Sequence, residues 1–432
     1  MSLKIKKETL LQYFLIYWML LDAGSAAAFV TIGSDAYFLS LLALGFGVCV
    51  YYHRTSRFQT CYKYDFQKFF YIITVSMLCT LLVTFGEMYI TIVLSVIGRI
   101  VIVVAAVTVN PQEFLARFIR TVSFLAIISL IIFCGYFIGG TQFWSFIAGK
   151  LPVVRSATYS IGAQYGSFLL CFNYFDPTRN SYIFGEPGEY QVVLSAALFL
   201  LLFSNHNLSE KERKRYMTVL IITMISTQST SGYFSMIGLL FFCVIERGRN
   251  QTLSVNQLQK ILIIGGVAVI VLGYLGVGDY FISKVLTEKV IDEAGQVNFN
   301  QGTASARWEG FILLGKYILD HPFDCILGIG YGGRVASHAI TSCNGLTNTI
   351  ADFGIVSVAW IIYCYSKSLF KYVSRWGALA GLFVILNIWI GQPVTIYTLI
   401  IVIAFAPMLT APKWNEKRDE GGYPYETQRI SL

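Results

Sequence analysis

Long uncharged apolar runs recur along the whole chain, and they constrain its fold more than any other feature. A helix that crosses a bilayer needs about 20 consecutive apolar residues. The runs here are continuous and do not alternate in period two, which predicts helices and excludes a β-barrel. Charged residues make up only 13% of 432 residues, and the mean hydropathy is +0.62. We therefore expect an all-α polytopic membrane protein, with one integral membrane domain over residues 1–432.

The runs predict about twelve transmembrane helices. They span 10–30, 35–52, 69–85, 88–109, 121–140, 188–204, 216–229, 232–246, 260–278, 346–366, 376–391 and 394–410. The seventh and eighth are short and are joined by the polar stretch STQSTSG, which indicates tilted or broken helices near a cavity. The first run follows a short basic stretch, Met1 to Glu8, and we interpret it as a retained helix, not a cleaved signal peptide.

The positions of the basic residues predict the orientation of these helices. Cytoplasmic loops of membrane proteins are enriched in Lys and Arg. Placing the N-terminus inside puts most of the 32 Lys and Arg residues on that side and none in the short outside turns. We therefore expect both termini in the cytoplasm. The net charge of +8 is then a topology signal, and nucleic acid is not an expected partner.

Two long outside loops remain, at about 141–187 and 279–345. Long loops on one face of a membrane bundle usually carry function. The second loop contains a predicted helix that ends at His321-Pro322 and lies flat on the bundle or on the bilayer surface. Its apolar face is made of Trp308, Phe311, Ile312, Gly315 and Leu319.

The first loop ends in RNSYIFGEPGEY, from Arg179 to Tyr190. Pro187 fits the first turn of a helix, so Glu186 and Glu189 are expected near the positive N-terminus of the sixth span. These residues allow two interpretations. One is a charged helix cap. The other is an arginine that grips phosphate beside a carboxylate that acts as a base or binds sugar hydroxyls.

The second loop contains two arginines and a glycine cluster. Arg307 opens the predicted helix, and Arg334 closes the stretch that contains Gly328, Gly330, Gly332 and Gly333. Arginine offers forked, permanently charged donors for phosphate, and glycine lets the backbone approach a ligand closely. The alternatives are an interfacial side chain for Arg307 and a solubilising residue for Arg334. The stretch GIGYGG is not a dinucleotide fingerprint, because no strand precedes it.

Three further ionisable residues stand out. His338 lies outside, near the start of the tenth span, where it is a candidate general base or a solvated loop histidine. Arg99 lies within the fourth span, and a charge there is usually paired or functional. Its candidate partners are Asp22, Glu87 and Asp352, and Asp352 is also placed to face a cavity.

The chain shows no pattern of metal ligands and no Walker motif, so we expect neither a zinc or magnesium centre nor ATP as the energy source. Most of the nine cysteines lie in apolar runs, where they act as small hydrophobic residues. Cys325 and Cys343 share the second loop, and the sequence leaves open whether they form a disulfide.

Taken in order along the chain, these stretches resemble the O-antigen polymerase and ligase superfamily of bacterial envelope enzymes. The resemblance covers most of the chain, since that family has about twelve spans, both termini inside and two long periplasmic loops. Its local marks are Arg179 with Phe184-Gly185-Glu186-Pro187, the stretch TQSTSG, Ser305-Ala306-Arg307-Trp308, His321-Pro322, Gly328-Ile329-Gly330-Tyr331-Gly332, and the stretch from Ser337 to Gly354.

The resemblance implies a fold similar to the C-type glycosyltransferases and a metal-independent glycosyl transfer at the periplasmic face of the inner membrane. Donor and acceptor would be oligosaccharides linked to undecaprenyl diphosphate, with no cofactor and with a chain-length regulator as a possible protein partner. The predicted catalytic residues are Glu186, His338 and Arg307. The predicted substrate-binding residues are Arg155, Arg179, Arg334, Tyr182, Tyr331, Asn344 and Asp352.

One departure from the family pattern favours the polymerase over the ligase. The ligase branch has a histidine, then Asn or a similar polar residue, nine residues and a glycine. Asn344 and Gly354 match that frame here, but Cys343 occupies the histidine position and His338 comes five residues before it. The alternatives are an O-antigen ligase and a lipid-linked oligosaccharide flippase. A transporter is expected to place its charges near the midplane, which Arg99 and Asp352 favour.

Overall fold

The structure is a computed structural model, and it describes residues 6–25, 27–55, 64–83, 90–155, 164–169, 171–173, 179–249, 303–330, 344–392 and 396–411. The first half of the chain contains α1 (Lys7–Leu20), the 3₁₀-helix η1 (Leu21–Ala23), the π-helix η2 (Ala27–Gly33), α2 (Ser34–Arg54), α3 (Tyr64–Val83), α4 (Ile90–Val109), α5 (Pro111–Ala148), β1 (Val153–Arg155), β2 (Gln164–Gly166), β3 (Cys171–Asn173) and α6 (Pro187–Phe203). The second half contains α7 (Glu210–Ser226), α8 (Thr230–Arg249), α11 (Thr303–Asp320), α12 (Pro322–Leu327), α14 (Gly345–Tyr372), α15 (Arg375–Gly391) and α16 (Thr398–Thr410).

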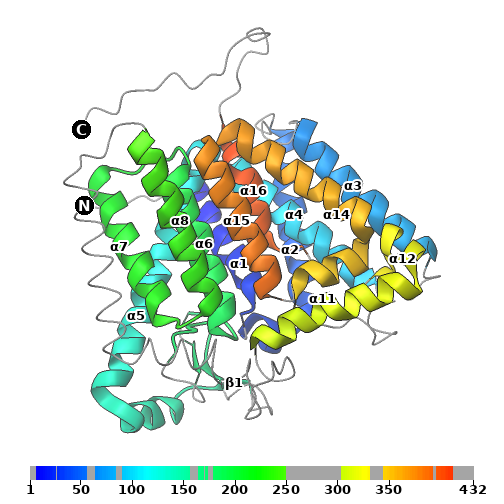
Figure 1. Cartoon of the computed structure of the whole chain (residues 1–432). Coiled ribbons are helices and arrows are strands. Elements are labelled where there is room, and N and C mark those ends of the chain that lie inside the picture. Colours follow the sequence, from blue (N-terminus) through cyan, green and yellow to red (C-terminus); the bar gives the residue numbers. More distant parts are fainter. Residues whose placement is uncertain are drawn as a thin grey trace.

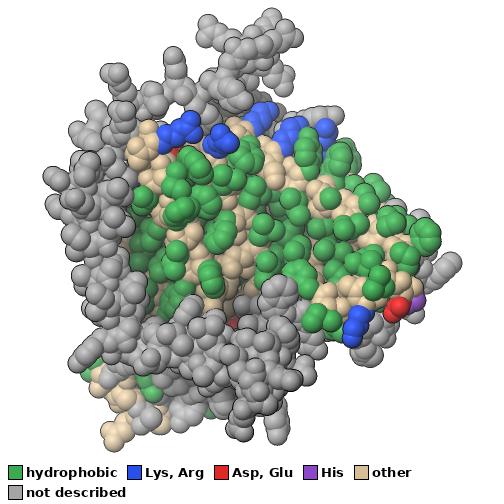
Figure 2. Space-filling view, in the orientation of Figure 1, with side chains coloured by type: hydrophobic (Ala, Val, Ile, Leu, Met, Phe, Trp, Pro, Cys, Tyr) green, Lys and Arg blue, Asp and Glu red, His purple; other side chains and the backbone are tan. Residues whose placement is uncertain are grey.

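The helices form a bundle with two distinct ends (Figure 1). We call one the basic end, because Lys and Arg side chains gather along it (Figure 2). It includes the end of α14 and the start of α15, with Lys371 and Arg375. We call the opposite end the sheet end, since the small antiparallel sheet β1-β2-β3 lies there and α11 runs across it (Figure 1). Hydrophobic side chains cover the flank between the two ends (Figure 2).

The helices at the centre are apolar on all sides. In α16, every residue from Thr398 to Leu409 is buried, and in α6 every residue from Tyr190 to Leu201 is buried. A helix that is hydrophobic all round belongs in the interior of a bundle. The surrounding helices therefore enclose α6 and α16, and they expose their own apolar side chains outward, as Ile131 of α5 and Ile237 of α8 do.

A helix overlaps every predicted span except 260–278, which lies outside the described residues. Within the described ranges, the helices long and apolar enough to cross a membrane are Ala27–Arg54, Pro111–Tyr136 and Gly345–Tyr372. Shorter apolar helices among the described residues are Phe66–Leu78, Val93–Val109, Pro187–Phe203, Arg375–Gly391 and Thr398–Thr410. The protein is therefore mostly helical, and its apolar helices support an all-α membrane protein.

The first predicted span, 10–30, is wrong at its C-terminal end. The helix stops at Ala23, because Gly24 adopts a left-handed conformation with φ of 98°. Ser25 then forms an isolated β-bridge with Phe184, and Gly24 accepts a 2.8 Å hydrogen bond from the N–H of Gly185. The chain therefore leaves the helix to pair with the segment that precedes α6.

Glycines allow α2 and α4 to touch backbone to backbone. A Cβ atom on Gly45 would lie 2.9 Å from the backbone nitrogen of Ile102, and one on Gly98 would lie 3.1 Å from the carbonyl oxygen of Phe38. Small residues at such crossings are the usual way for apolar helices to pack tightly in lipid, where no hydrophobic force brings them together.

The tenth predicted span, 346–366, is not one continuous helix. Gly354 in α14 has φ of 76° and ψ of 157°, a conformation open essentially to glycine alone. Gly328 lies against this break, and a Cβ atom on Gly328 would lie 2.6 Å from the backbone nitrogen of Gly354. The N–H of Ile329 donates to Ala351, and the Ser76 hydroxyl donates to Phe353, so both carbonyls beside the break are satisfied.

This contact gives one glycine of the cluster a role in packing. Gly328 brings the backbone close to α14. Gly332 and Gly333 lie outside the described residues.

The predicted helix of the second loop is confirmed in its extent. α11 ends at Asp320, and Pro322 begins α12. The buried core of α11 contains Leu314, whereas Leu319 on the expected apolar face is 84% exposed. The helix therefore packs on α14 through Leu314, and Leu319 of the predicted apolar face points away from the bundle.

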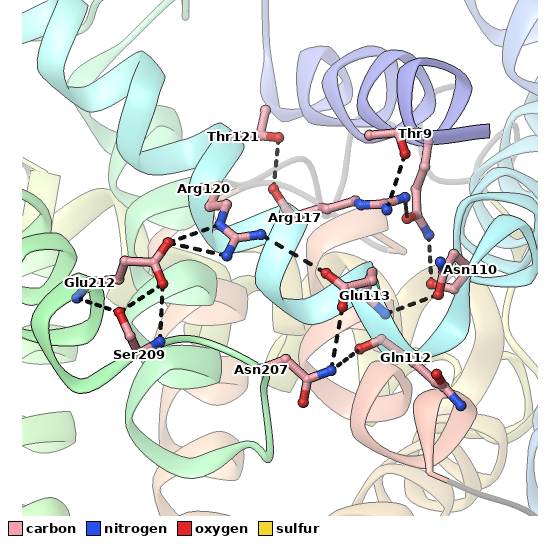
Figure 3. A network of polar contacts seen from close by, with 11 residues as sticks. Thr9, Asn110, Gln112, Glu113, Arg117, Arg120, Thr121, Asn207, Ser209 and Glu212 are labelled. Carbon is pink, nitrogen blue, oxygen red and sulfur yellow. Dashed lines mark hydrogen bonds and ion pairs between the residues drawn. The ribbon is translucent and has the colours of Figure 1, made fainter. Parts of the chain in front are cut away.

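Polar side chains tie α1, α5 and α7 together at the basic end (Figure 3). Gln12 donates to the carbonyls of Ala106 and Asn110, and its oxygen accepts a 2.6 Å bond from the buried Arg117. Arg120 forms an ion pair with Glu212 at 3.1 Å. This network fixes the end of the bundle opposite to the candidate site.

Candidate functional site

The segment before α6 folds against the turn between α7 and α8. Arg179 is half-buried and donates from Nη2 to the carbonyl oxygen of Gln228 at 3.4 Å. The N–H of Asn180 donates to the Ser226 carbonyl at 3.0 Å, and its side-chain amide donates to the Ser226 and Ser129 hydroxyls. Two stretches that carry the family resemblance, RNSYIFGEPGEY and TQSTSG, are therefore neighbours at the sheet end.

Both of these stretches contain strained backbone. Tyr182 has φ of 50° and Gln228 has φ of 48°, and they are the only non-glycine residues with positive φ in the described part of the chain. Such conformations usually cost about 1–3 kcal/mol and persist where the surroundings enforce them, often at functional sites. The coincidence of the two outliers in contacting segments makes this place the strongest candidate site.

The structure argues against Tyr182 as a substrate-binding residue. Its side chain is 3% exposed, and its hydroxyl donates to the Leu169 carbonyl at 2.5 Å. Burial raises the pKa of this hydroxyl above its usual value. A ring enclosed in this way holds the loop in place and has no face free to stack on a sugar.

Glu186 is the N-cap residue of α6, and Pro187 is its first helical residue, as the sequence predicts. Glu186 is exposed at the sheet end. Its N–H donates at 3.1 Å to the carboxylate of Glu189, so Glu189 fulfils the capping role that was one of the two interpretations. The candidate base at Glu186 therefore stays a prediction, and its accessibility is compatible with that role.

The carboxylate of Glu189 also lies directly against the backbone of Gly24. A Cβ atom at residue 24 would overlap the carboxylate carbon and both its oxygens. Gly24 thus serves two purposes, since it also supplies the positive φ that ends the first helix.

Arg99 pairs with Asp22, one of its three predicted partners. Its Nε contacts both carboxylate oxygens, at 2.9 and 3.0 Å. The Asp22 side chain is completely buried, and that of Arg99 is 17% exposed. The same carboxylate accepts from the backbone N–H of Thr398 at 3.3 Å and from the Thr398 hydroxyl. Asp22 therefore caps the N-terminus of α16 from another part of the chain.

Asn344 and Asp352 are buried in or beside α14. Asn344 is the N-cap residue, and its side-chain oxygen accepts from the N–H groups of Leu346 and Thr347 at 3.0 and 3.3 Å. This oxygen therefore has a capping role, and the substrate contact of Asn344 stays a prediction. Asp352 is 4% exposed and is not the partner of Arg99.

The remaining predicted site residues are not brought together by the described part of the structure. Arg155 lies in β1 and Arg307 in α11, but their side chains are not described. Tyr331, Arg334 and His338 lie outside the described residues, as does Cys343, so the second base candidate and the disulfide stay predictions.

Sequence reasoning missed Asn180 and Thr398. Asn180 is buried and joins α5, α7 and the segment before α6, yet no local pattern distinguishes it from any other loop asparagine. Thr398 supplies both a backbone and a side-chain donor to Asp22, and only the fold brings the two together.

Within the described ranges, no three His, Cys, Asp or Glu side chains lie together in a metal-binding arrangement. Comparison of the chain with protein-family models finds no match, and comparison with curated proteins finds no significant relative.

Proposed function

We propose that this protein is a membrane glycosyltransferase that polymerises oligosaccharide repeat units carried on undecaprenyl diphosphate. The observation that carries the proposal is the contact of Arg179 with Gln228, close in sequence to the exposed carboxylate of Glu186. This contact brings a cation to the strained TQSTSG turn at one end of an apolar helical bundle. Glu186 lies further along the same segment, as the N-cap residue of α6. The family resemblance, whose local marks include these two stretches, supplies the substrate class.

The proposed reaction joins two lipid-linked glycans. An acceptor hydroxyl of a new repeat unit attacks the anomeric carbon of the growing chain. The bond from that carbon to the diphosphate oxygen breaks, and undecaprenyl diphosphate leaves with the electron pair. The hydroxyl proton passes to a base, for which Glu186 and His338 are the proposed candidates. Arginine side chains, Arg179 and Arg307 first among them, stabilise the negative charge on the leaving diphosphate.

A gene deletion tests this function against its two alternatives. Loss of a polymerase leaves lipid A core capped with a single repeat unit. Loss of a ligase leaves bare core while polymer accumulates on the lipid carrier. Loss of a flippase leaves bare core and no polymer. A deletion strain that still makes long chains of normal length distribution excludes the polymerase.

One observation favours the flippase as a second candidate. Transporters often bind substrate where helices are interrupted within the membrane. The break of α14 at Gly354 is a feature of that kind. The deletion phenotype separates this candidate from the polymerase, since a flippase is needed even for the first capped core.

Arg179→Gln tests the role of the arginine in living cells. We expect the variant to reduce the long-chain ladder to single-unit caps at unchanged protein level. Lys214→Ala is the matched control, because Lys214 is a 73% exposed cation at the basic end. A normal ladder from Arg179→Gln would remove Arg179 from the mechanism.

A further inference from the structure

Only one nitrogen of the Arg99 guanidinium forms hydrogen bonds to the described residues. Nε donates to both carboxylate oxygens of Asp22, and Nη1 and Nη2 have no hydrogen-bond partner among those residues. Two terminal nitrogens of a guanidinium form the fork that matches phosphate geometry. An unused fork on a residue within an apolar bundle is uncommon, because charges there are usually paired or functional.

The pair lies near the sheet end of the bundle, although Arg99 is in the middle of α4. Asp22 lies in η1, two residues before the chain turns at Gly24 to meet Gly185, and Thr398 begins α16. Because the Arg99 guanidinium contacts residues at these helix ends, it lies at the same depth in the bilayer as they do. It is therefore close to the membrane face on which the candidate site lies.

The segment that precedes Phe38, a residue in contact with Arg99, is loosely packed. Phe38 of α2 lies under the guanidinium, with Cζ 4.7 Å from the ring centroid. The junction before α2 is irregular, since the π-helix η2 ends at Gly33 with φ of 89°. A Cβ atom at Gly33 would meet nothing within 4 Å, and Val30 in η2 is 52% exposed. A lipid in the bilayer can therefore approach this junction from the side.

The charges around Arg99 allow an anion to bind beside its guanidinium. Asp22 offsets the charge of Arg99, but its carboxylate is shared with the N-terminus of α16. Glu189, the other carboxylate nearby, lies in the first turn of α6. Each carboxylate thus faces a helix N-terminus that carries about half a positive charge. The donors on the outer edge of the guanidinium remain available.

We propose that Arg99 binds the phosphate group of a lipid through Nη1 and Nη2, with Asp22 as the positioning residue that orients the guanidinium. The occupant is a polyprenyl diphosphate or a phospholipid headgroup, which share this chemistry. The polyprenyl identity rests on the proposed function, because only a lipid-linked glycosyl transfer supplies such a carrier. The binding of a lipid phosphate does not depend on it.

The test measures binding of undecaprenyl diphosphate to the full-length protein in nanodiscs of neutral phosphatidylcholine, by native mass spectrometry. Asp22→Asn/Arg99→Gln removes both charges together, so no buried charge is left alone. We expect it to weaken binding at least about tenfold, the loss expected for a forked contact. Arg120→Gln/Glu212→Gln is the matched control, because it removes an ion pair at the basic end, and it is expected to bind as the wild type does.

Arg99→Lys provides a second test in case the double variant does not fold. It keeps a positive charge beside Asp22 but replaces the fork by a point charge, so several-fold weaker binding is expected. Unchanged binding by both variants overturns the proposal and leaves Arg99 as a structural ion pair.

A second arm replaces phosphatidylcholine by anionic phosphatidylglycerol. If undecaprenyl diphosphate still binds with the same Arg99 dependence, the carrier is the occupant. If phosphatidylglycerol displaces it, the site binds phospholipid headgroups, and the proposal holds with that source. This experiment measures lipid binding, whereas the deletion strain reports on chain length. A wrong polymerase assignment and a wrong Arg99 assignment can therefore be told apart.

Discussion

The carboxylate of Asp22 connects segments that are far apart in the sequence. It accepts from Arg99 of α4 and from Thr398 of α16, and Asp22 itself lies in η1, directly after α1. A buried pair of this kind is destabilising when one partner is removed, because the other charge is left uncompensated. The pair therefore matters for the fold in addition to its proposed role in lipid binding.

Asp22→Asn is expected to destabilise the protein by about 3–5 kcal/mol, whereas Asp22→Asn/Arg99→Gln is expected to lose clearly less. Unfolding of the purified protein in detergent, followed by circular dichroism, gives both values. The single variant Arg99→Gln completes the comparison. If the losses from Asp22→Asn and Arg99→Gln add up to the loss of the double variant, the two residues do not interact.

His206 predicts a pH dependence at the basic end. Its Nε2 donates to the Leu201 carbonyl at 3.1 Å, and Nδ1 is buried without a partner in the described part of the chain. The pKa of this imidazole is lowered, and burial is the largest cause. The hydrogen bond to Leu201 raises the pKa, and the positive charge of Arg213 lowers it further. The unfolded chain therefore binds a proton more readily than the folded one, and stability falls with decreasing pH.

The contribution of His206 is complete above its unfolded pKa of about 6.5 and is lost as the pH falls through the lower folded value. Between pH 7.5 and 5.5 the melting temperature of the wild type should fall more than that of His206→Gln, which cannot take up a proton. Equal decreases in both proteins would contradict the assignment.

At the scale of elements, the crossing of α2 and α4 gives a prediction with an internal control. Gly45→Ala places a methyl group 2.9 Å from a backbone nitrogen of α4, so the helices must separate. Gly47→Ala on the same helix meets nothing within 4 Å. Alanine raises helix propensity by up to about 1 kcal/mol at either position. We expect Gly47→Ala to be neutral or stabilising and Gly45→Ala to lower the melting temperature; the same effect at both sites would refute the close contact.

The break in α14 gives a second prediction at this scale. Gly354→Ala is expected to cost about 1–3 kcal/mol from backbone strain alone. Its Cβ would also lie 2.5 Å from the backbone carbon of Leu327. Gly315→Ala in the middle of α11 meets open space and serves as the control. Comparison of their thermal unfolding in detergent decides whether the break is required; wild-type stability of Gly354→Ala would show that it is not.

The positions of the helices could be predicted from apolar runs, because a bilayer requires long uncharged segments. The end of the first span and the break within the tenth could not. Both depend on glycines, Gly24 and Gly354, whose positive φ is enforced by contacts with residues remote in the sequence, Gly185 and Gly328. Hydropathy carries no information on such contacts.

The candidate site could be predicted only in part for the same reason. Pro187 and Glu186 follow local rules for helix N-termini, so their placement was predictable. The partner of Arg99 was limited to three acidic residues by depth in the membrane, and only the fold selects Asp22. The burial of Tyr182 and the contact of Arg179 with Gln228 arise from tertiary packing, for which the sequence offers no signal.

At the scale of the whole molecule, the two ends of the bundle differ in kind. The basic end is closed by ion pairs and caps, such as Arg120 with Glu212. The sheet end contains the strained turns, an exposed carboxylate and the half-buried Arg179. This polarity matches the proposed topology, with the basic end in the cytoplasm and the sheet end where lipid-linked glycans are joined.

Reconstitution tests the proposed polymerisation most directly. The purified full-length protein is placed in proteoliposomes with undecaprenyl-diphosphate-linked repeat units and no other enzyme, and the products are separated by gel electrophoresis and weighed by mass spectrometry. We predict a ladder of lipid-linked chains, with one undecaprenyl diphosphate released for each unit added, and its loss in Arg179→Gln. Repeat units that stay unjoined in the presence of folded wild-type protein would contradict the proposed function.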